Sequence, residues 1–230
     1  MMAQPNFLAQ IHTIIEEHHL LKHPFYQLWN QGQLTLTMLQ EYAQEYYLQV
    51  HHFPTYVSAT HAACDDLAIR QMLLENLIEE ERGTANHPEL WLRFAEGLGV
   101  ERQAILSRHP LPETQESVRI LKNLARSENP AAGLAALYAY EAQIPAVAKT
   151  KIEGLEEFYG ITSEQALSFF KVHEKADEIH SQVTQEALAN LCQTEEQQQV
   201  AIEATQAAVR AFNLLLDGVY ETYCQEACVA

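Results

Sequence analysis

Apolar residues recur along this chain at intervals of three and four positions, which is the spacing of one face of an α-helix. The segments with this spacing begin at capping residues or prolines, and no segment shows the strict alternation of a half-buried strand. We therefore expect an all-α fold, a bundle of about seven or more helices in a single domain that spans residues 1–230.

The expected helices are delimited by local signals. The helix that opens at Asp65 or Asp66 should direct Leu67, Leu73, Leu74 and Leu77 inward, and Gly83 weakens it by about 1 kcal/mol relative to alanine. The expected segments are residues 6–20, 25–30, 35–63 with a kink at Pro54, 65–87, 88–97, shorter helices within 100–128, 129–159 with a kink at Pro145, 163–192 and 194–223.

Three polar residues interrupt the apolar stripe of the segment 163–192. With His173 at 0°, Asp177 falls at about 40° and His180 at about −20°, because a helix turns about 100° per residue. Two imidazoles and a carboxylate thus point in the same direction as the core residues. Burying such groups without partners costs several kcal/mol, so either a metal ion or a hydrogen-bonded polar cluster must satisfy them.

Glu80 and His87 lie on an inward stripe of another segment, where Leu73, Leu77, Glu80, Thr84 and His87 follow a 4-3-4-3 spacing. They are about 20° apart in phase if the helix is continuous. Glu79 and Glu81 point about 100° to either side of Glu80, so we expect them to face solvent. The alternative for Glu80 is one member of a charged helix face.

Glu141 is the one ionisable acid between Pro130 and Ala148, on a stripe with Leu134 and Ile144. A lone carboxylate in such an apolar segment is rarely buried without a partner. It is expected to be a metal ligand, and the alternative is that it accepts a hydrogen bond from a tyrosine or a histidine.

The six candidates form a chemically consistent set of three imidazoles and three carboxylates. Two divalent ions with three carboxylates carry roughly +1, and a bridging hydroxide brings the charge to about zero, which a dry core tolerates. Mixed nitrogen and oxygen ligation without sulfur favours iron or manganese, and a metal pair can activate oxygen or water. The candidates are Glu80, His87, Glu141, His173, Asp177 and His180.

Composition excludes several functions. The formal net charge is −17, and no cluster of lysines and arginines offers phosphate contacts, so nucleic-acid binding is not expected. No membrane span and no signal peptide are evident, and a cytoplasmic location is expected. The four cysteines form no CxxC pair and are interpreted as incidental thiols.

Motifs over nearly the whole chain resemble those of the chlamydia protein associating with death domains and its relatives. This family is a branch of the heme-oxygenase-like group that also includes TenA and PqqC. The motifs are His23-Pro-Phe-Tyr26-Gln-Leu-Trp29, Glu41-Tyr-Ala-Gln-Glu-Tyr46-Tyr47, Phe53-Pro54, Cys64-Asp-Asp66, Asn86-His87, Leu90-Trp91, Ala135-Ala-Leu-Tyr-Ala-Tyr140-Glu141-Ala-Gln-Ile-Pro145, Lys151-Ile-Glu-Gly-Leu155 and His173-Glu-Lys-Ala-Asp177-Glu-Ile-His180.

The resemblance implies a heme-oxygenase-like fold, a homodimer, and a dinuclear Fe/Fe or Fe/Mn centre held by the six candidates above. It also implies a self-sacrificing synthesis of para-aminobenzoate, the folate precursor, from one of the protein's own tyrosines. Molecular oxygen and an external reductant would be co-substrates. The tyrosine proposed as the source matches Tyr26, Tyr42 is a second tyrosine of interest, and the lysine proposed to take part in the amination matches Lys151. The His51-His52 pair differs from the family pattern, and we expect it to lie in solvent or behind the ligands.

Other functions remain as alternatives. TenA-like hydrolysis of thiamin fragments uses a cysteine on the helix that carries Glu141, and no cysteine lies between Cys64 and Cys192. Three further alternatives are a PqqC-like role in cofactor metabolism, a death-domain-type interaction module and a catalytically silent scaffold. Nothing in the sequence supports a death-domain partner. For Tyr26 and Lys151 the alternatives are an ordinary core tyrosine and a solvated helix cation.

Overall fold

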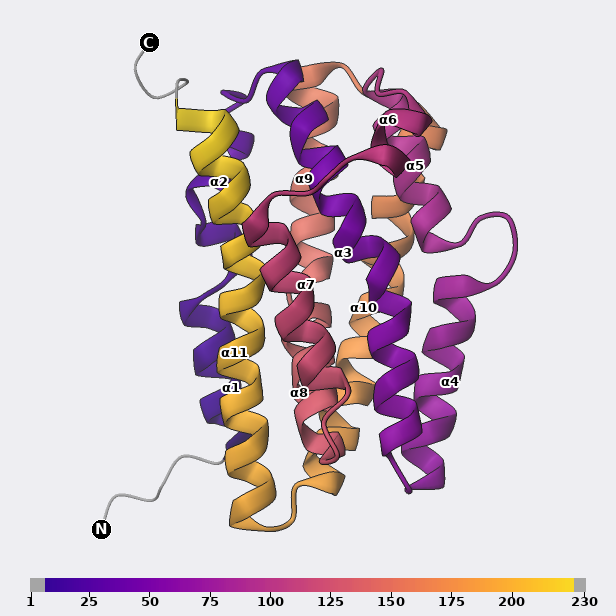
Figure 1. The fold of residues 1–230 in the computed structure, drawn as a ribbon, viewed down its shortest axis with the longest axis vertical. Coiled ribbons are helices and arrows are strands. Elements are labelled where there is room, and N and C mark those ends of the chain that lie inside the picture. The colour runs from indigo at the N-terminus through magenta and orange to yellow at the C-terminus, as the bar shows by residue number, and fades with distance from the viewer. Residues whose placement is uncertain (1–6, 226–230) are drawn as a thin grey trace.

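The computed structural model describes residues 7–225, except for the side chains of residues 175–180 (Figure 1). That part of the chain contains eleven α-helices and no strand, so the all-α prediction is confirmed. The helices are α1 Phe7–Glu17, α2 Pro24–Asn30, α3 Leu36–Ala63, α4 Leu67–Glu81, α5 His87–Gly97, α6 Arg102–Ser107, α7 Pro112–Ala125, α8 Pro130–Glu141, α9 Ile144–Tyr159, α10 Glu164–Leu191 and α11 Glu195–Val219, with a 3-10 helix η1 Leu20–Lys22 and a π-helical segment η2 Tyr220–Cys224.

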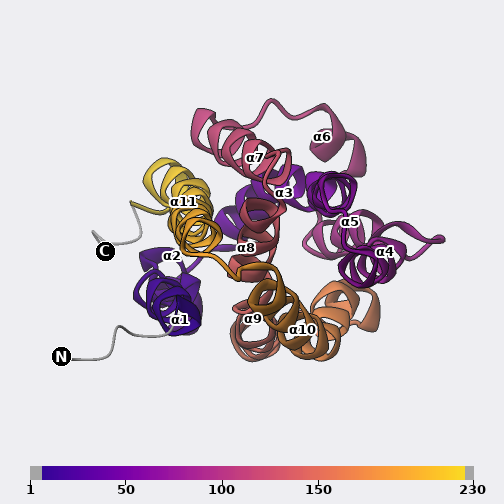
Figure 2. The same ribbon diagram turned by 90° about the horizontal axis from the view of Figure 1, so that it is seen from below.

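Helix α8 lies at the centre of the bundle, and α3, α7, α10 and α11 pack around it (Figure 2). Every residue from 131 to 141 is buried, which fits a segment that is apolar on all sides. Its alanines and Gly133 let neighbours approach closely, and a Cβ at Gly133 would collide with the side chain of Thr60 on α3. Glu141, the last residue of α8, is thereby placed inside the bundle.

Side-chain caps define most helix starts. Five residues at the expected helix starts act as caps, because the side chain of each accepts a hydrogen bond from a backbone N–H in the first turn, a contact that typically stabilises a helix by about 1 kcal/mol. These caps are Thr35, Asp66, Asn129, Ser163 and Thr194.

Two expected helices are each divided in the structure. The segment 65–87 ends at Glu81, where Gly83 adopts a positive φ of 79°, and His87 begins a new helix, α5. The segment 129–159 breaks at residues 142–143, and Pro145 lies in the first turn of α9. Proline lacks an N–H and clashes with the preceding turn, so at position 145 it ends one helix and starts another.

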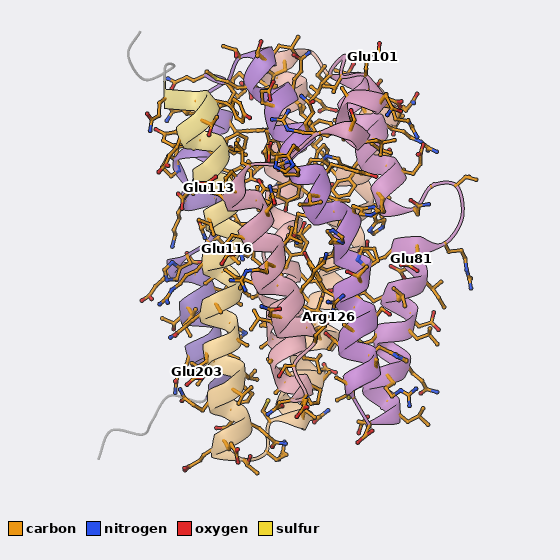
Figure 3. All side chains as sticks on the ribbon, viewed as in Figure 1. Glu81, Glu101, Glu113, Glu116, Arg126 and Glu203 are labelled. Atoms are coloured by element: carbon orange, nitrogen blue, oxygen red, sulfur yellow. The ribbon has the colours of Figure 1, made fainter. Side chains whose placement is uncertain are left out.

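The inward direction predicted for α4 is only partly correct. Leu73 is buried and Leu77 is half-buried, but Leu67 is 66% exposed and Leu74 is 43% exposed. Helix α4 lies on the outside of the bundle against α3 and α5, so only a narrow face is covered. Acidic residues face solvent, as Glu81 on α4 and Glu203 on α11 do in Figure 3.

A buried ionic network fixes the upper part of α3. The Glu45 carboxylate is fully buried and accepts hydrogen bonds from Arg108 Nε at 2.6 Å, Leu111 N at 2.9 Å and Thr114 Oγ1 at 2.8 Å. Arg108 also donates to the hydroxyl of Tyr223 in η2 at 2.7 Å. Breaking such a buried pair costs about 3–5 kcal/mol, so the network holds α3, the α6–α7 connection and η2 together.

No helix within the described residues has both the length and the apolar character that crossing a membrane requires.

Gly154 allows α9 to approach α2, and substituting it tests this contact. A Cβ there would lie 2.5 Å from Trp29 Nε1 and 2.7 Å from Cδ1. Alanine gains up to about 1 kcal/mol of helix propensity but overpacks the core by about 1–3 kcal/mol. We expect Gly154→Ala to lower the free energy of unfolding by about 1–2 kcal/mol in urea denaturation. In a Trp29→Phe background the loss should be smaller, and additive losses would contradict the contact.

Candidate metal centre

Three of the predicted ligands converge in the core. One donor atom of each of Glu80, His87 and His173 lies within 4.8 Å of the others, and the residues are 6%, 5% and 5% exposed. They come from the end of α4, the start of α5 and the middle of α10. Three ionisable side chains in a buried space need either mutual hydrogen bonds or a shared cation.

The break between α4 and α5 brings Glu80 to His87. Asn86 caps α5 through its side chain, which accepts from Glu89 N at 3.0 Å, and Pro88 occupies the first turn. Oε2 of Glu80 and Nδ1 of His87 are 2.8 Å apart, yet the imidazole does not have the alignment of a hydrogen bond to this oxygen. Two ligand atoms that bind the same cation can lie this close to each other without forming a hydrogen bond.

The orientation of His173 also fits a metal ligand. Its Nδ1 lies 2.6 Å from the carbonyl oxygen of Phe169, and a carbonyl only accepts, so Nδ1 carries the proton. Nε2 is then the unprotonated nitrogen, which is the form that binds a metal ion. Metal-binding histidines usually donate their second nitrogen to a carbonyl or a carboxylate in this way. The His87 and His173 rings have centroids 4.4 Å apart.

Glu141 is buried at 2% exposure, but it is not a member of the three-residue cluster. Its Oε1 accepts from Asn76 Nδ2 of α4 at 2.7 Å, and its Oε2 accepts from Thr184 Oγ1 of α10 at 2.9 Å. The prediction that this carboxylate is buried is correct, whereas the tyrosine or histidine proposed as the alternative partner does not appear in these two bonds.

The remaining two predicted ligands, Asp177 and His180, have side chains outside the described residues. Helix α10 itself continues through both positions. Their assignment as ligands stays a prediction.

The residues expected to carry the organic chemistry form a second buried cluster. Lys151 is 3% exposed, and its Nζ donates to the Tyr42 hydroxyl at 2.6 Å. The amine also lies 5.0 Å from the ring centre of Tyr46 and 5.7 Å from that of Tyr26. Burial lowers the pKa of Lys151 to about 7. The alternative of a solvated helix cation is therefore wrong.

Tyr26 and Tyr42 are fully enclosed, at 1% and 0% exposure. Burial raises the pKa of both phenols well above the ordinary value, because a phenolate is poorly solvated there. Each phenol also affects the pKa of the other, so the two hydroxyl groups are neighbours. Lys151, Tyr42 and Tyr26 thus form one cluster, in which Lys151 bonds directly to Tyr42.

His23 fixes the helix that carries Tyr26. Its Nδ1 accepts from Phe25 N at 3.1 Å and so caps α2, while its Nε2 lies 3.0 Å from Asp217 Oδ1 on α11. Burial lowers the pKa of His23, which favours the neutral ring that this cap requires. The start of α2 is thereby held against α11.

Two aromatic rings connect the clusters. Trp91 of α5 has its ring centre 5.3 Å from Lys151 Nζ and 4.9 Å from the ring of Phe169. The Phe169 ring lies 4.2 Å from that of His173. The Trp91 indole donates to the Ala43 carbonyl at 2.7 Å, which fixes its orientation. The metal-type donors and the buried amine therefore share one apolar compartment.

The expectation that the His51-His52 pair lies in solvent is confirmed for His51, and two buried polar residues were missed. His51 is exposed, and His52 lies beside Lys122 Nζ at 3.1 Å. Asn76 and Thr184 were missed. Asn76 precedes Glu80 by four positions, about 40° in phase, and Thr184 follows His180 by four. The signal that could have identified Asn76 and Thr184 is that both are polar residues on the buried stripe of a helix.

Comparisons with known proteins agree with the family that the motifs indicate. A family model described as iron-containing redox enzyme matches residues 40–213. The 4-aminobenzoate synthase of Nitrosomonas europaea is 40% identical, covering 97% of this chain and 94% of its own. The 4-aminobenzoate synthase of Chlamydia trachomatis is 39% identical, covering 92% and 91%.

A solved structure shows the fold. The domain from Shewanella denitrificans, described as having a heme oxygenase-like fold, superposes with a TM-score of 0.81 at 21% identity, covering 100% of this chain and 97% of that one. The chain therefore belongs to the iron-containing redox enzymes of heme-oxygenase-like fold, and within them to the family of the 4-aminobenzoate synthases.

Proposed function

We propose that this chain is a 4-aminobenzoate synthase, an oxygen-dependent oxidoreductase that uses a pair of transition-metal ions and one of its own tyrosines. The observation that carries the proposal is the shared compartment of two buried clusters, Glu80–His87–His173 and Lys151–Tyr42–Tyr26. Relatives of this chain at about 40% identity are 4-aminobenzoate synthases.

Glu80, His87 and His173 would hold one metal ion, and Glu141, Asp177 and His180 would complete the site for a second. The donor set of imidazoles and carboxylates fits iron or manganese. When bound, this pair would supply the electrons and the oxygen activation that the oxidation requires, with Fe/Fe and Fe/Mn as the candidate pairs and an external reductant to recharge them.

The product can be derived from a tyrosine side chain atom by atom. In tyrosine, Cβ stands opposite the phenolic oxygen on the ring, and in 4-aminobenzoate the carboxylate stands opposite the amine. Conversion therefore breaks the Cα–Cβ bond, oxidises Cβ to a carboxylate with molecular oxygen as the oxidant, and exchanges the phenolic C–O bond for a C–N bond, with the oxygen leaving as water. Tyr26 is the proposed source of the ring, since it is enclosed next to the buried amine.

Lys151 is the proposed participant in the amination. With a pKa of about 7, a large fraction of the amine is neutral and nucleophilic near neutral pH, unlike an ordinary lysine. Tyr42 accepts the hydrogen bond from Lys151 and neighbours Tyr26, so it can orient the amine and hold a proton close to the Tyr26 phenol. The surrounding rings exclude water from the amine and the phenol. A homodimer and a cytoplasmic location remain predictions.

Ring-labelled tyrosine incorporated into the protein tests the source of the product. We expect labelled 4-aminobenzoate from protein incubated with metal, oxygen and reductant, as detected by mass spectrometry. Tyr26→Phe should abolish the product because phenylalanine has no phenolic oxygen to replace. Tyr56→Phe is the matched control, because Tyr56 is also buried on the bundle interior and bonds to Gln49 instead. Unlabelled product from labelled protein would refute self-sacrifice.

A pair of adjacent glutamates tests the metal site. Glu80→Gln removes the charge of a buried candidate ligand, so bound iron or manganese should fall and product should decrease by at least about 100-fold. Glu81→Gln changes an exposed neighbour and should alter neither quantity. Elemental analysis and product assay measure the two effects. Equal behaviour of the two variants would contradict the assignment of Glu80.

The buried lysine makes a prediction about stability and pH. The unfolded chain holds the Lys151 proton up to the ordinary pKa of 10.5, but the folded protein releases it at about 7, so the folded state binds fewer protons between these values. The stability of the parent protein therefore rises with pH across this window. The Lys151→Met variant lacks this amine and should not gain stability in this way. The difference in free energy of unfolding, variant minus parent, should therefore fall from pH 7 to pH 10 in urea denaturation.

Lys149→Met is the control for this measurement, because Lys149 is an exposed lysine on the same helix. Its difference from the parent should change little over the same range. If Lys151→Met behaves like Lys149→Met, the amine is not desolvated in the folded protein.

A further inference from the structure

The carboxylate of Glu141 is held by two neutral donors from two different helices. Asn76 Nδ2 contacts Oε1 at 2.7 Å, and Thr184 Oγ1 contacts Oε2 at 2.9 Å. Glu141, Asn76 and Thr184 are 2%, 3% and 1% exposed. All three groups are thus removed from solvent, and hydrogen bonds to a charged group are stronger than those between neutral groups.

The two donors lie on the helices that supply the other candidate ligands. Asn76 precedes Glu80 by one turn of α4, and Thr184 is in α10, one turn beyond position 180. The bonds therefore connect the end of α8 to the same two helices that carry Glu80 and His173. The Glu141 carboxylate is therefore bonded to α4 at a point one helical turn from Glu80.

The chemistry of these donors suits a carboxylate that is to bind a cation. An amide and a hydroxyl orient the carboxylate but leave its negative charge in place, whereas an arginine or a lysine would neutralise it. The bonds from Asn76 and Thr184 therefore do not by themselves cancel the attraction of the carboxylate for a positive ion.

The carbonyl oxygen of the Asn76 side chain gives a second indication that a further group belongs in this site. Because Nδ2 faces an oxygen that only accepts, the amide orientation is determined, and Oδ1 is buried without a hydrogen-bond partner. A buried carbonyl oxygen without a donor is unfavourable. Its presence indicates a donor that the described residues do not supply, such as a water molecule of the metal centre.

We propose that Asn76 and Thr184 are positioning residues that hold Glu141 for the second cation of the centre, and that Asn76 Oδ1 accepts a hydrogen bond from water in that centre. The inference rests on the two-metal site of the proposed function. It assigns a role to two residues outside the set of six ligands. Partners that orient ligands in this way typically change metal affinity 10–100-fold.

The experiment is a titration of metal-free protein with Mn²⁺, in which the electron paramagnetic resonance signal of free Mn²⁺ reports the binding of each ion. The parent protein should bind two ions. Thr184→Val and Asn76→Leu have nearly the same shape as the native residues but lack the donors. They should weaken the second ion about 10–100-fold and leave the first, at Glu80, His87 and His173, unchanged. Thr184→Ser retains the hydroxyl and should recover the parental affinity.

Thr205→Val is the matched control. Thr205 is a fully buried threonine whose hydroxyl bonds to a carbonyl of its own helix, α11, at 2.8 Å. It should leave both ions unaffected. Thermal unfolding of each metal-free variant separates a loss of folding from a loss of binding.

The outcomes distinguish this inference from the proposed function. If the parent binds two ions and both variants retain its second affinity, only the role of Asn76 and Thr184 is overturned. It is also overturned if both ions weaken equally, or if Thr205→Val has the same effect. If the parent binds fewer than two Mn²⁺ ions, the two-metal site itself fails and this inference fails with it.

Discussion

The burial of charge in an apolar helical bundle is the constraint on which the rest of this structure depends. Glu80, His87, His173 and Glu141 are each at most 6% exposed, and Lys151 is 3% exposed. Ionisable groups in such surroundings must be paired, neutralised or bound to a cation. The protein meets this requirement differently in three parts of the bundle, and the way each buried charge is stabilised decides what that part of the bundle can do chemically.

At the top of α3 the solution is a complete ion pair. Glu45 and Arg108 satisfy each other with additional backbone and hydroxyl donors, so this network stabilises the fold. Around Glu80, His87 and His173 the donors converge on one another instead, and the backbone bond of His173 directs its second nitrogen inward. The two clusters have similar burial, but only the second is arranged to bind a cation.

Around Lys151 the solution is neutralisation. Aromatic rings surround the amine, Tyr42 accepts its hydrogen bond, and no carboxylate among the described residues pairs with it, so burial lowers the pKa of the amine to about 7. An amine that is neutral in part can act as a nucleophile, and an enclosed tyrosine next to it is protected from solvent. Trp91 and Phe169 bring this cluster and the metal-type donors into one compartment.

The sequence by itself determined the helical architecture, most of the caps and the buried side of the ligand-bearing helices, because these depend on spacing and on local hydrogen bonds. Glu80, Glu141 and His173 were recognisable as polar residues on apolar stripes. The sequence did not determine that His87 starts a new helix, that Lys151 is buried, or that Asn76 and Thr184 hold Glu141. Those features depend on which helices pack together, and residues such as Asn76 and Glu141, 65 positions apart, meet only when the tertiary structure forms.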